Sequence, residues 1–227
     1  FCIRVADGNC WPVDLKKEEK QDRGQLSNET NEESIVKNVL AIKSATDPHL
    51  VIDSIGNAER VTAAVGPNVL PHIAGLLAEG LKQRLIQSEK PLTIIACENM
   101  IGGSALLKEK VYEKLSEVEK AQFTERFSFP DAAVDRIVPI EVNEDKLLVK
   151  VEPFYEWVVE ESGITGPNPP VKGITFVQDL QPYIERKLYT VNTGHSVVAY
   201  LGYLAGIKGI HEALVNEEIR EATEKTL

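Results

Sequence analysis

A lysine, an asparagine and a histidine stand close together near the end of the sequence, as Lys187, Asn192 and His195. On an α-helix that turns about 100° per residue, Asn192 lies about 140° and His195 about 80° around from Lys187. All three therefore share one side of a predicted helix. An amine can take a proton, an amide can hold a developing oxyanion, and an imidazole can bind hydroxyl groups. The pattern favours acid–base chemistry on a substrate that carries hydroxyl groups.

The environment of this lysine decides whether it can act as a base. An unperturbed lysine has a pKa of about 10.4 and is a poor base at neutral pH, whereas burial disfavours the ammonium form and lowers the pKa. We expect this side of the helix to be buried, because the surrounding residues are apolar or small: Val191, Val197, Val198, Ala199 and Leu201. The alternative is a solvated lysine at a helix end, directly after Glu185 and Arg186.

Upstream segments alternate between apolar strands and helices. Residues 60–65 form a predicted strand that ends at a Gly-Pro turn, and residues 68–87 form an amphipathic helix. Residues 92–97 are a second apolar strand, followed by a helix at 103–117. This order is typical of a parallel sheet covered by helices, which holds its sites at the carboxyl ends of the strands.

The rest of the chain is less regular. We expect a loop at 24–34, strand-like residues at 35–42, a helix at 47–55, and a proline-rich linker at 163–172. Short strands at 129–140, 146–152 and 156–159 indicate antiparallel rather than βαβ pairing. From residue 176 the pattern is helical to the end, with predicted helices at 176–188, 190–205, 208–216 and 216–226.

The spacing Lys-x4-Asn-x2-His resembles the signature of the polyol-specific long-chain dehydrogenases, the mannitol dehydrogenase family. Three further blocks are similar to the family in the same order: Thr62–Pro71 (TAAVGPNVLP), Ile95–Met100 (IACENM) and Val134–Pro139 (VDRIVP). The resemblance is close from about residue 41 to residue 227 and weak before that. Four blocks in order are far more specific than any one of them.

The resemblance implies an NAD-dependent oxidoreductase that interconverts D-mannitol 1-phosphate and D-fructose 6-phosphate without a metal. Lys187 would be the general base, and Asn192 and Asn99 would donate to the substrate oxygen. His195 would bind substrate hydroxyls and help to orient Lys187. Without the rest of the motif, Asn99 could be a helix N-cap, and His195 could be a core histidine with its polar atoms hydrogen-bonded.

The same resemblance implies cofactor contacts. Ala64, Val65, Gly66 and Pro67 would place backbone against the nicotinamide ribose, although a strand-ending turn also explains them. Asp7 would bind the adenosine ribose and favour NAD, although it can equally be an ordinary Asp-Gly turn residue.

The sequence has no G-x-G-x-x-G turn, the motif that lets a pyrophosphate approach a helix N-terminus. On the alignment through Asp7, the chain begins at the second strand of the family fold. The sequence therefore does not predict how tightly the chain binds NAD. Two alternatives remain: a non-catalytic truncated paralogue or fragment, and a dehydrogenase of an unphosphorylated polyol or a hexuronate.

The amino-acid composition limits which partners the protein can bind and which cellular compartment it suits. The net charge of −10 argues against nucleic acid, and no run approaches the roughly 18 apolar residues of a membrane span. Three cysteines without metal-ligand spacing, and no signal-peptide pattern, indicate a reduced, cytoplasmic setting. We expect a sugar phosphate or polyol phosphate substrate and a monomer or weak homo-oligomer.

Together these patterns predict an α/β fold in two main parts. A Rossmann-like parallel sheet domain, incomplete at its N-terminus, would occupy residues 1–140, with strands and a linker at 141–173. An all-helical domain would occupy residues 174–227, and we expect the active site in the cleft between the two parts.

Overall fold

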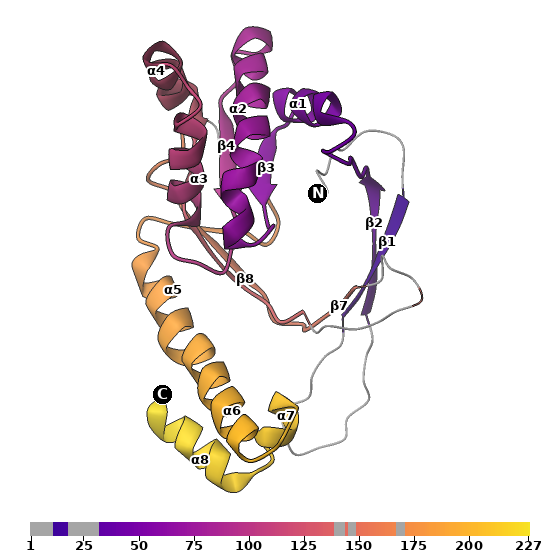
Figure 1. The fold of residues 1–227 in the computed structure, drawn as a ribbon, viewed down its shortest axis with the longest axis vertical. Coiled ribbons are helices and arrows are strands. Elements are labelled where there is room, and N and C mark those ends of the chain that lie inside the picture. Colours follow the sequence, from indigo (N-terminus) through magenta and orange to yellow (C-terminus); the bar gives the residue numbers. More distant parts are fainter. Residues whose placement is uncertain (1–10, 18–31, 139–143, 145–148, 167–170) are drawn as a thin grey trace. The chain divides into compact units, whose positions relative to one another are not determined.

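The computed structural model describes residues 11–17, 32–138, 144, 149–166 and 171–227 (Figure 1). The chain divides into two compact units, residues 1–178 and 179–227, and each is described by itself. The candidate cofactor residue Asp7 lies outside the described part.

A parallel three-stranded sheet forms the centre of the first unit. Its strands are β3 (Arg60–Ala63), β4 (Leu92–Ala96) and β5 (Phe127–Ser128), in that order. The helices that accompany them are α1 (Pro48–Gly56), α2 (Leu70–Gln87), α3 (Gly103–Tyr112) and α4 (Glu117–Arg126), and α1 to α3 cover one face of the sheet (Figure 1). The parallel sheet predicted from the alternation of strands and helices is confirmed.

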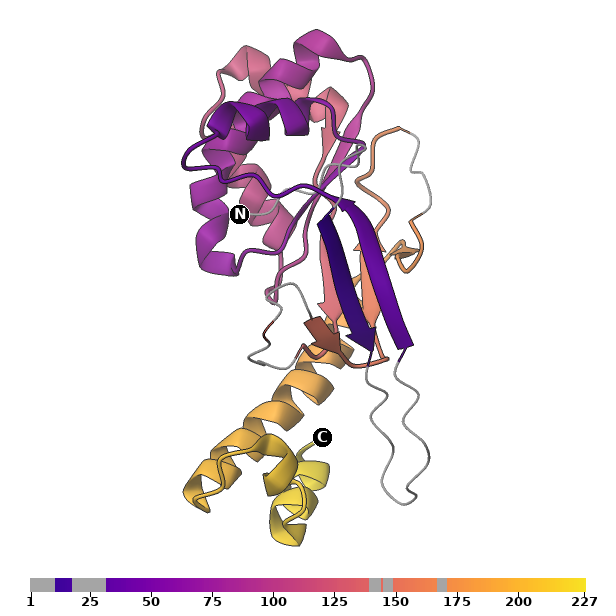
Figure 2. The ribbon, with the colours of Figure 1, turned by 90° about the vertical axis from the view of Figure 1, so that its right-hand side faces the viewer.

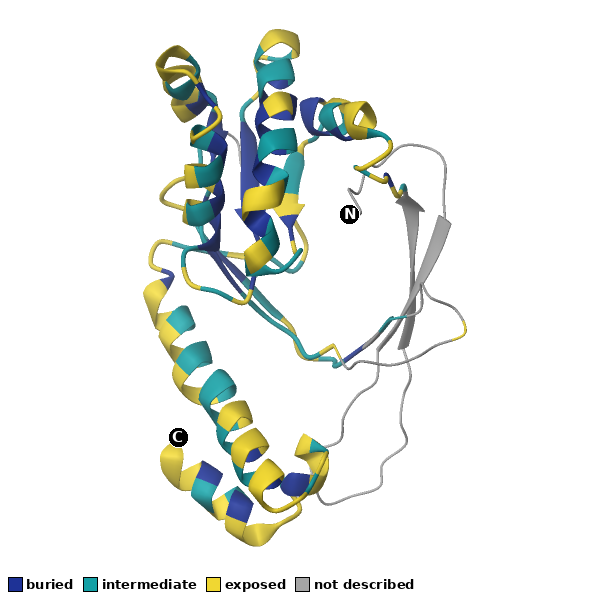
Figure 3. Cartoon of the chain, viewed as in Figure 1, coloured by how far each residue is buried: buried dark blue, intermediate teal, exposed yellow. Residues whose placement is uncertain are grey.

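Strand β4 is buried along its whole length (Figure 3). Ile94 and Ala96 belong to the core beneath the helices, together with fully buried residues such as Phe123. Ile95 belongs to a second core, where it packs with Val159. Because successive side chains of a strand point to opposite faces, this single strand joins the two cores.

The second core belongs to a mixed sheet of β6 (Ala132–Asp135), β8 (Glu156–Glu160) and β9 (Thr175–Val177). Strand β6 pairs with β8 antiparallel, as the short spacing predicted, but β8 pairs with β9 parallel. The helix predicted to begin at residue 176 is therefore wrong at its start. Thr175, Phe176 and Val177 are β-branched or aromatic, and pairing with β8 suits such residues better than a helix does.

A further sheet contains β1 (Trp11–Lys17), β2 (Glu32–Val39) and β7 (Val149–Val151). Strands β1 and β2 are antiparallel, and β1 pairs with β7 in parallel (Figure 2). The loop predicted at 24–34 is wrong for its last three residues, which begin β2.

The second unit is helical. Its elements are α5 (Gln181–Arg186), a π-helical segment η2 (Lys187–Asn192), α6 (Thr193–Leu204), α7 (Ile210–Ala213) and α8 (Glu217–Thr226). Its buried residues are Val198, Ala213 and Ile219, which join α6 to α7 and α8. The sequence predicted a break between helices at residue 189, but the chain continues through it as a π-helix.

Helix α4 was not predicted, although it carries a clear local signal. Ser116 accepts from the backbone N–H of Glu119, and the Glu119 carboxylate accepts from the Ser116 N–H at 2.7 Å. This reciprocal capping box starts a new helix only a few residues after Tyr112, the last residue of α3.

Arg84 of α2 ties the surrounding loops together. Its buried guanidinium donates to the carbonyls of Gly56, the last residue of α1, and of Ala58, just after it, at 3.0 and 2.7 Å. It also donates to the carbonyls of Lys90 and Pro91, just before β4, at 3.2 and 3.3 Å. Burial lowers the pKa of this guanidinium from its usual value. Its four carbonyl partners offset the desolvation and fix both loops.

Helices α1 and α2 approach each other closely at Gly80. A methyl group there would lie 2.6 Å from Cβ of Ile55 and 2.7 Å from its Cγ2. We expect Gly80→Ala to lower the free energy of unfolding by about 1–3 kcal/mol, because the core must shift to make room. Urea denaturation followed by circular dichroism measures this difference.

Gly75 of the same helix is the matched control, since no described heavy atom lies within 4 Å of the position its Cβ would take. Gly75→Ala should leave stability unchanged or raise it by up to about 1 kcal/mol through helix propensity. Equal effects of the two substitutions would contradict the close approach at Gly80.

Candidate active site

The turn that follows β3, residues Ala64–Pro67, is held in an unusual backbone conformation. Gly66 has φ 93° and ψ 140°, a region that residues with a side chain rarely adopt. No described heavy atom lies within 4 Å of the place where its Cβ would be, so the backbone is open on that side. Pro67 then begins a short 3₁₀ turn that leads into α2. We call residues Ala64–Pro67 the β3–α2 turn.

A carboxylate from the neighbouring strand secures this turn. Glu98, just beyond the end of β4, accepts from the N–H of Val65 at 2.8 Å and from the N–H of Gly66 at 2.9 Å. Its two oxygens each take one bond, and only 6% of the residue is exposed. Sequence reasoning missed Glu98, although an acidic residue directly after an entirely apolar strand was a signal that could have found it.

Asn99, the predicted substrate donor, follows Glu98 and is exposed. It thus lies at the carboxyl end of β4, beside the β3–α2 turn that Glu98 binds. The alternative reading of Asn99 as the N-cap of the following helix is wrong, because α3 begins at Gly103 with Gly102 as its N-cap.

A second carboxylate occupies the N-terminus of α3. Asp131 accepts from the N–H of Ser104 at 2.9 Å and from the N–H of Ala105 at 3.3 Å. The buried Ser104 hydroxyl in turn accepts from the N–H of Ala96 at 2.9 Å. The free N–H groups of a helix N-terminus, where an α/β fold commonly binds phosphate, are thus already bound within the protein.

In the helical unit, Lys187 and Asn192 are the first and last residues of the π-helical segment. The N–H of Thr193 donates to the carbonyl of Leu188, five residues earlier, and the Thr193 hydroxyl donates to the same carbonyl at 2.8 Å. The hydroxyl of Thr190 donates to the carbonyl of Arg186. Threonine hydroxyls that bond back to carbonyls compete with the regular α-helical pattern.

This π-helix corrects the predicted spacing of the three candidate residues. The separation of about 140° assumed an α-helix, in which residue i+4 lies above residue i. In a π-helix the residue above i is i+5, so Asn192 lies close to the direction of Lys187. His195 follows three residues later, within α6.

The predicted burial of this face is only partly correct. Lys187 and Asn192 are partly buried, and His195 is exposed. The reason is that α6 packs on α7 and α8 through other residues, chiefly Val198 and Gly202.

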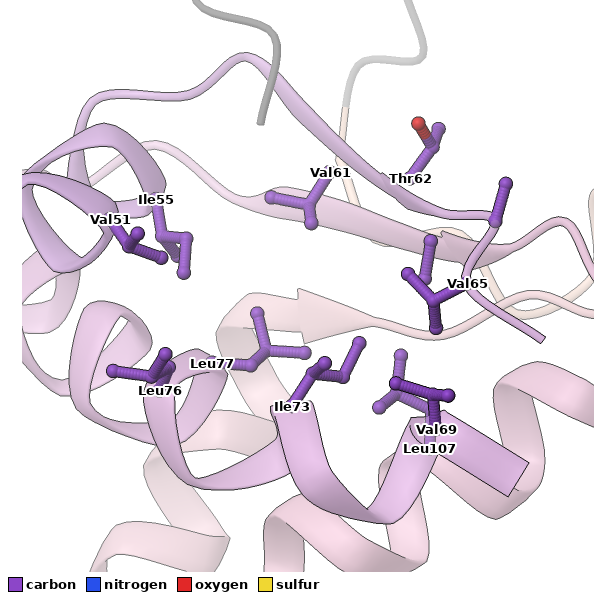
Figure 4. Close-up of a pocket in the computed structure, with 12 residues that line it drawn as sticks. Val51, Ile55, Val61, Thr62, Val65, Val69, Ile73, Leu76, Leu77 and Leu107 are labelled. Atoms are coloured by element: carbon purple, nitrogen blue, oxygen red, sulfur yellow. The ribbon is translucent and has the colours of Figure 1, made fainter. Parts of the chain in front are cut away.

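An apolar cavity of about 500 Å³ runs along β3 (Figure 4). Side chains from α1, β3 and α2 point toward one another across it, including Ile55, Val61 and Ile73. Ala64 and Val65 of the β3–α2 turn line one end, while Thr62 is its only hydroxyl-bearing lining residue among those described. The cavity suits apolar packing against β3 and offers little to bind a phosphate.

The β3–α2 turn fits the nicotinamide end of a dinucleotide, because Gly66 leaves its backbone uncovered at the carboxyl end of a parallel strand. The pyrophosphate end does not fit here, either at the N–H groups of Val65 and Gly66 or at the N-terminus of α3. Glu98 and Asp131 already take the donors that would bind it.

The helices and the polar side chains of the described residues exclude two further kinds of site there. None of their helices has the length and apolar character of a membrane span. Among the same residues, no three His, Cys, Asp or Glu side chains gather in the way that metal ligands do.

Comparison with protein families gives two adjacent matches. The family described as "Mannitol dehydrogenase Rossmann domain" matches residues 5–173, and the family described as "Mannitol dehydrogenase C-terminal domain" matches residues 179–227. A Rossmann domain with a parallel sheet, followed by a helical C-terminal domain, is thus the fold class of the chain.

Similar curated proteins share one name, mannitol-1-phosphate 5-dehydrogenase. The chain is 53% identical to that of Brevibacillus brevis over 225 residues, which are 99% of this chain and 58% of the relative. It is 50% identical to that of Geobacillus stearothermophilus over 225 residues (99% and 59%). It is 48% identical to that of Bacillus subtilis over 227 residues (100% and 60%). The chain therefore spans somewhat more than half the length of these relatives.

Solved structures show the same fold at lower identity. Mannitol 2-dehydrogenase of Pseudomonas fluorescens, in a ternary complex with NAD and D-mannitol, has a TM-score of 0.74 and 20% identity, with 93% of this chain and 51% of that chain covered. A substrate-free D-sorbitol dehydrogenase has a TM-score of 0.72 and 19% identity, with 94% and 52% covered.

Cys97, at the end of β4, offers a test of this local structure. Burial, and to a lesser degree Glu98, raise the pKa of its thiol to about 12. Because the thiolate is the reactive form, we expect alkylation of Cys97 at pH 8.5 to be at least about 100-fold slower than that of a free cysteine. The rate should keep rising tenfold per pH unit well above pH 9, where a free cysteine levels off.

Mass spectrometry of the Cys97 peptide after timed N-ethylmaleimide treatment measures this rate. The same residue in urea-unfolded chain is the reference, since unfolding removes the burial. Equal rates in the folded and unfolded chain would contradict the buried, neutral thiol.

Proposed function

Because this chain belongs to the mannitol dehydrogenase family, we propose that it carries the activity of an NAD-dependent oxidoreductase that interconverts D-mannitol 1-phosphate and D-fructose 6-phosphate. The observation that carries the proposal is the identity of 48–53% to three proteins of that name over at least 99% of the chain. In our proposal the substrate is a polyol phosphate or sugar phosphate, and the reaction uses no metal. We also expect a cytoplasmic protein that is a monomer or a weak homo-oligomer.

Lys187 is the proposed general base. Its amine takes the proton of the substrate hydroxyl as the alcohol is oxidised, and returns it in the reverse direction. Asn192 and Asn99 donate amide N–H groups to the same oxygen and stabilise its negative charge. His195 binds a neighbouring hydroxyl of the substrate. The π-helical turn supports this assignment, because such turns occur frequently at functional sites.

NAD, when bound, supplies the hydride acceptor. The residues proposed to hold it are Asp7 at the adenosine ribose and Ala64, Val65, Gly66 and Pro67 at the nicotinamide end. The open backbone of Gly66 supports the second part of this assignment.

A titration of the purified chain with NADH, followed by fluorescence, is the first test. Saturable binding supports the proposal. A chimera in which this chain replaces the 225 matched residues of the Brevibacillus brevis relative is the second test. We expect the chimera to oxidise NADH in the presence of fructose 6-phosphate. Activity only on unphosphorylated sugars or on hexuronates would instead identify one of those compounds as the substrate class.

A non-catalytic protein is the second candidate. It is favoured by the two carboxylates of the protein itself that accept from the N–H groups of Val65 and Gly66 and from the N-terminus of α3. No binding of NADH by the chain at millimolar concentration, together with an inactive chimera, would support it.

Lys187→Ala tests the proposed base. In the chimera we expect kcat to fall by roughly 10²–10⁴, the usual contribution of general-base catalysis, while the Kd for NADH hardly changes. Polyol oxidation by the unmutated chimera should rise with pH as the ammonium loses its proton, and this rise should vanish in the variant. Steady-state kinetics across pH measure both effects.

Two further variants sharpen the result. Lys187→Arg should not restore activity, because a guanidinium keeps its proton at any working pH. Lys225→Ala removes an exposed lysine of the same unit and should leave kcat unchanged. A Lys187→Ala chimera that keeps most of its kcat and its pH profile would show that the lysine is not the base.

A further inference from the structure

We propose that Glu98 is a positioning residue that holds the β3–α2 turn in the shape that receives the nicotinamide end of NAD. The role rests on the proposed function, but the contact behind it belongs to the chain itself. Glu98 lies at the end of one parallel strand, and the turn it binds lies at the end of the next. Its side chain thus links the two strand ends where the predicted cofactor and substrate residues lie.

The geometry of the contact calls for a carboxylate. Two backbone N–H groups, of Val65 and Gly66, point at two different oxygens at 2.8 and 2.9 Å. An ionised carboxylate accepts at both oxygens, whereas a glutamine would turn an NH₂ group toward one of the donors. That donor would then be left without an acceptor beside a side chain at position 98 that is only 6% exposed in the native protein.

The turn needs such a contact because packing does little to hold it. Gly66 has positive φ, and no described heavy atom lies within 4 Å of its missing Cβ. The contacts that define its backbone are its own N–H to Glu98 and its carbonyl, which accepts from the N–H of Val69 at 2.9 Å. Without Glu98, we expect the turn to sample other backbone conformations of glycine.

Asp131, between β5 and β6, provides a matched control within the same unit. It too is a carboxylate that accepts from two successive backbone N–H groups near the carboxyl end of β4, but its donors are Ser104 and Ala105 of α3. Loss of either carboxylate should lower stability. Only the loss of Glu98 should change the β3–α2 turn.

The experiment compares Glu98→Gln with Asp131→Asn in the 227-residue chain. Amide hydrogen exchange by NMR, without cofactor, should show exchange of Val65 and Gly66 faster by roughly 10–100-fold in Glu98→Gln, as the loss of hydrogen bonds to a charged group implies. Asp131→Asn should leave these two amides unchanged relative to the global stability of each variant. The Kd for NADH should rise about tenfold or more in Glu98→Gln and stay within twofold in Asp131→Asn.

A second variant covers the case in which Glu98→Gln does not fold. Gly66→Ala strains the turn through its positive φ without a steric clash, and it should weaken NADH binding while Glu98 remains in place.

The outcomes separate the two proposals. Unchanged exchange of Val65 and Gly66 in Glu98→Gln, or faster exchange with an unchanged Kd for NADH, overturns the role of Glu98. If Glu98→Gln does not fold, an unchanged Kd in Gly66→Ala overturns it. Failure of the unmutated chain to bind NADH, together with an inactive chimera, overturns the proposed function instead, and the exchange experiment still tests the contact.

Discussion

The burial of β4 on both faces is the constraint on which the first unit depends. Ile94 and Ala96 pack beneath the helices and Ile95 packs against the mixed sheet, so neither layer can move without disturbing the strand. Because the strand is fixed in this way, the residues that follow it have few possible positions. Cys97, Glu98 and Asn99 therefore leave the core at a defined place, beside the β3–α2 turn. The neutral thiol of Cys97 is a consequence of the same burial.

The carboxylates of Glu98 and Asp131 bind backbone N–H groups that could otherwise bind the phosphates of a dinucleotide. In an α/β fold, backbone N–H groups at the ends of parallel strands commonly receive phosphate. Here Glu98 takes those of the β3–α2 turn and Asp131 takes those of α3. A phosphate brought to either place would meet a negative charge instead of free donors. These donors at the strand ends are therefore not available to the phosphates of a cofactor.

Sequence patterns predicted the elements whose side chains follow a regular period. The apolar run at 92–97 and the amphipathic helix at 68–87 are confirmed almost to their ends, because burial on a fixed face leaves a strong signal. Strand β9 and the boundary between α3 and α4 were missed because pairing and capping decide them, through β8 and through Ser116. Glu98 was missed although an acidic residue after the apolar run at 92–97 marks it, because its partners are backbone N–H groups that no residue type in the sequence identifies. The roles of Lys187, Asn192, His195 and Asn99 stay predictions.

The π-helical segment gives a physical reading of the spacing in Lys-x4-Asn-x2-His. A separation of five residues places two side chains far apart around an α-helix, but one above the other around a π-helix. The hydroxyls of Thr190 and Thr193 donate to carbonyls one turn back, and the bond from Thr193 spans the five residues of the wider turn. The wide turn ends at Asn192, and His195 follows at the ordinary helical spacing of three. An amine, an amide and an imidazole can then line one stripe of a single helix, whereas an unbroken α-helix would spread them over a much wider arc. The motif spacing thus matches the local backbone, because the wide turn begins at Lys187 and ends at Asn192.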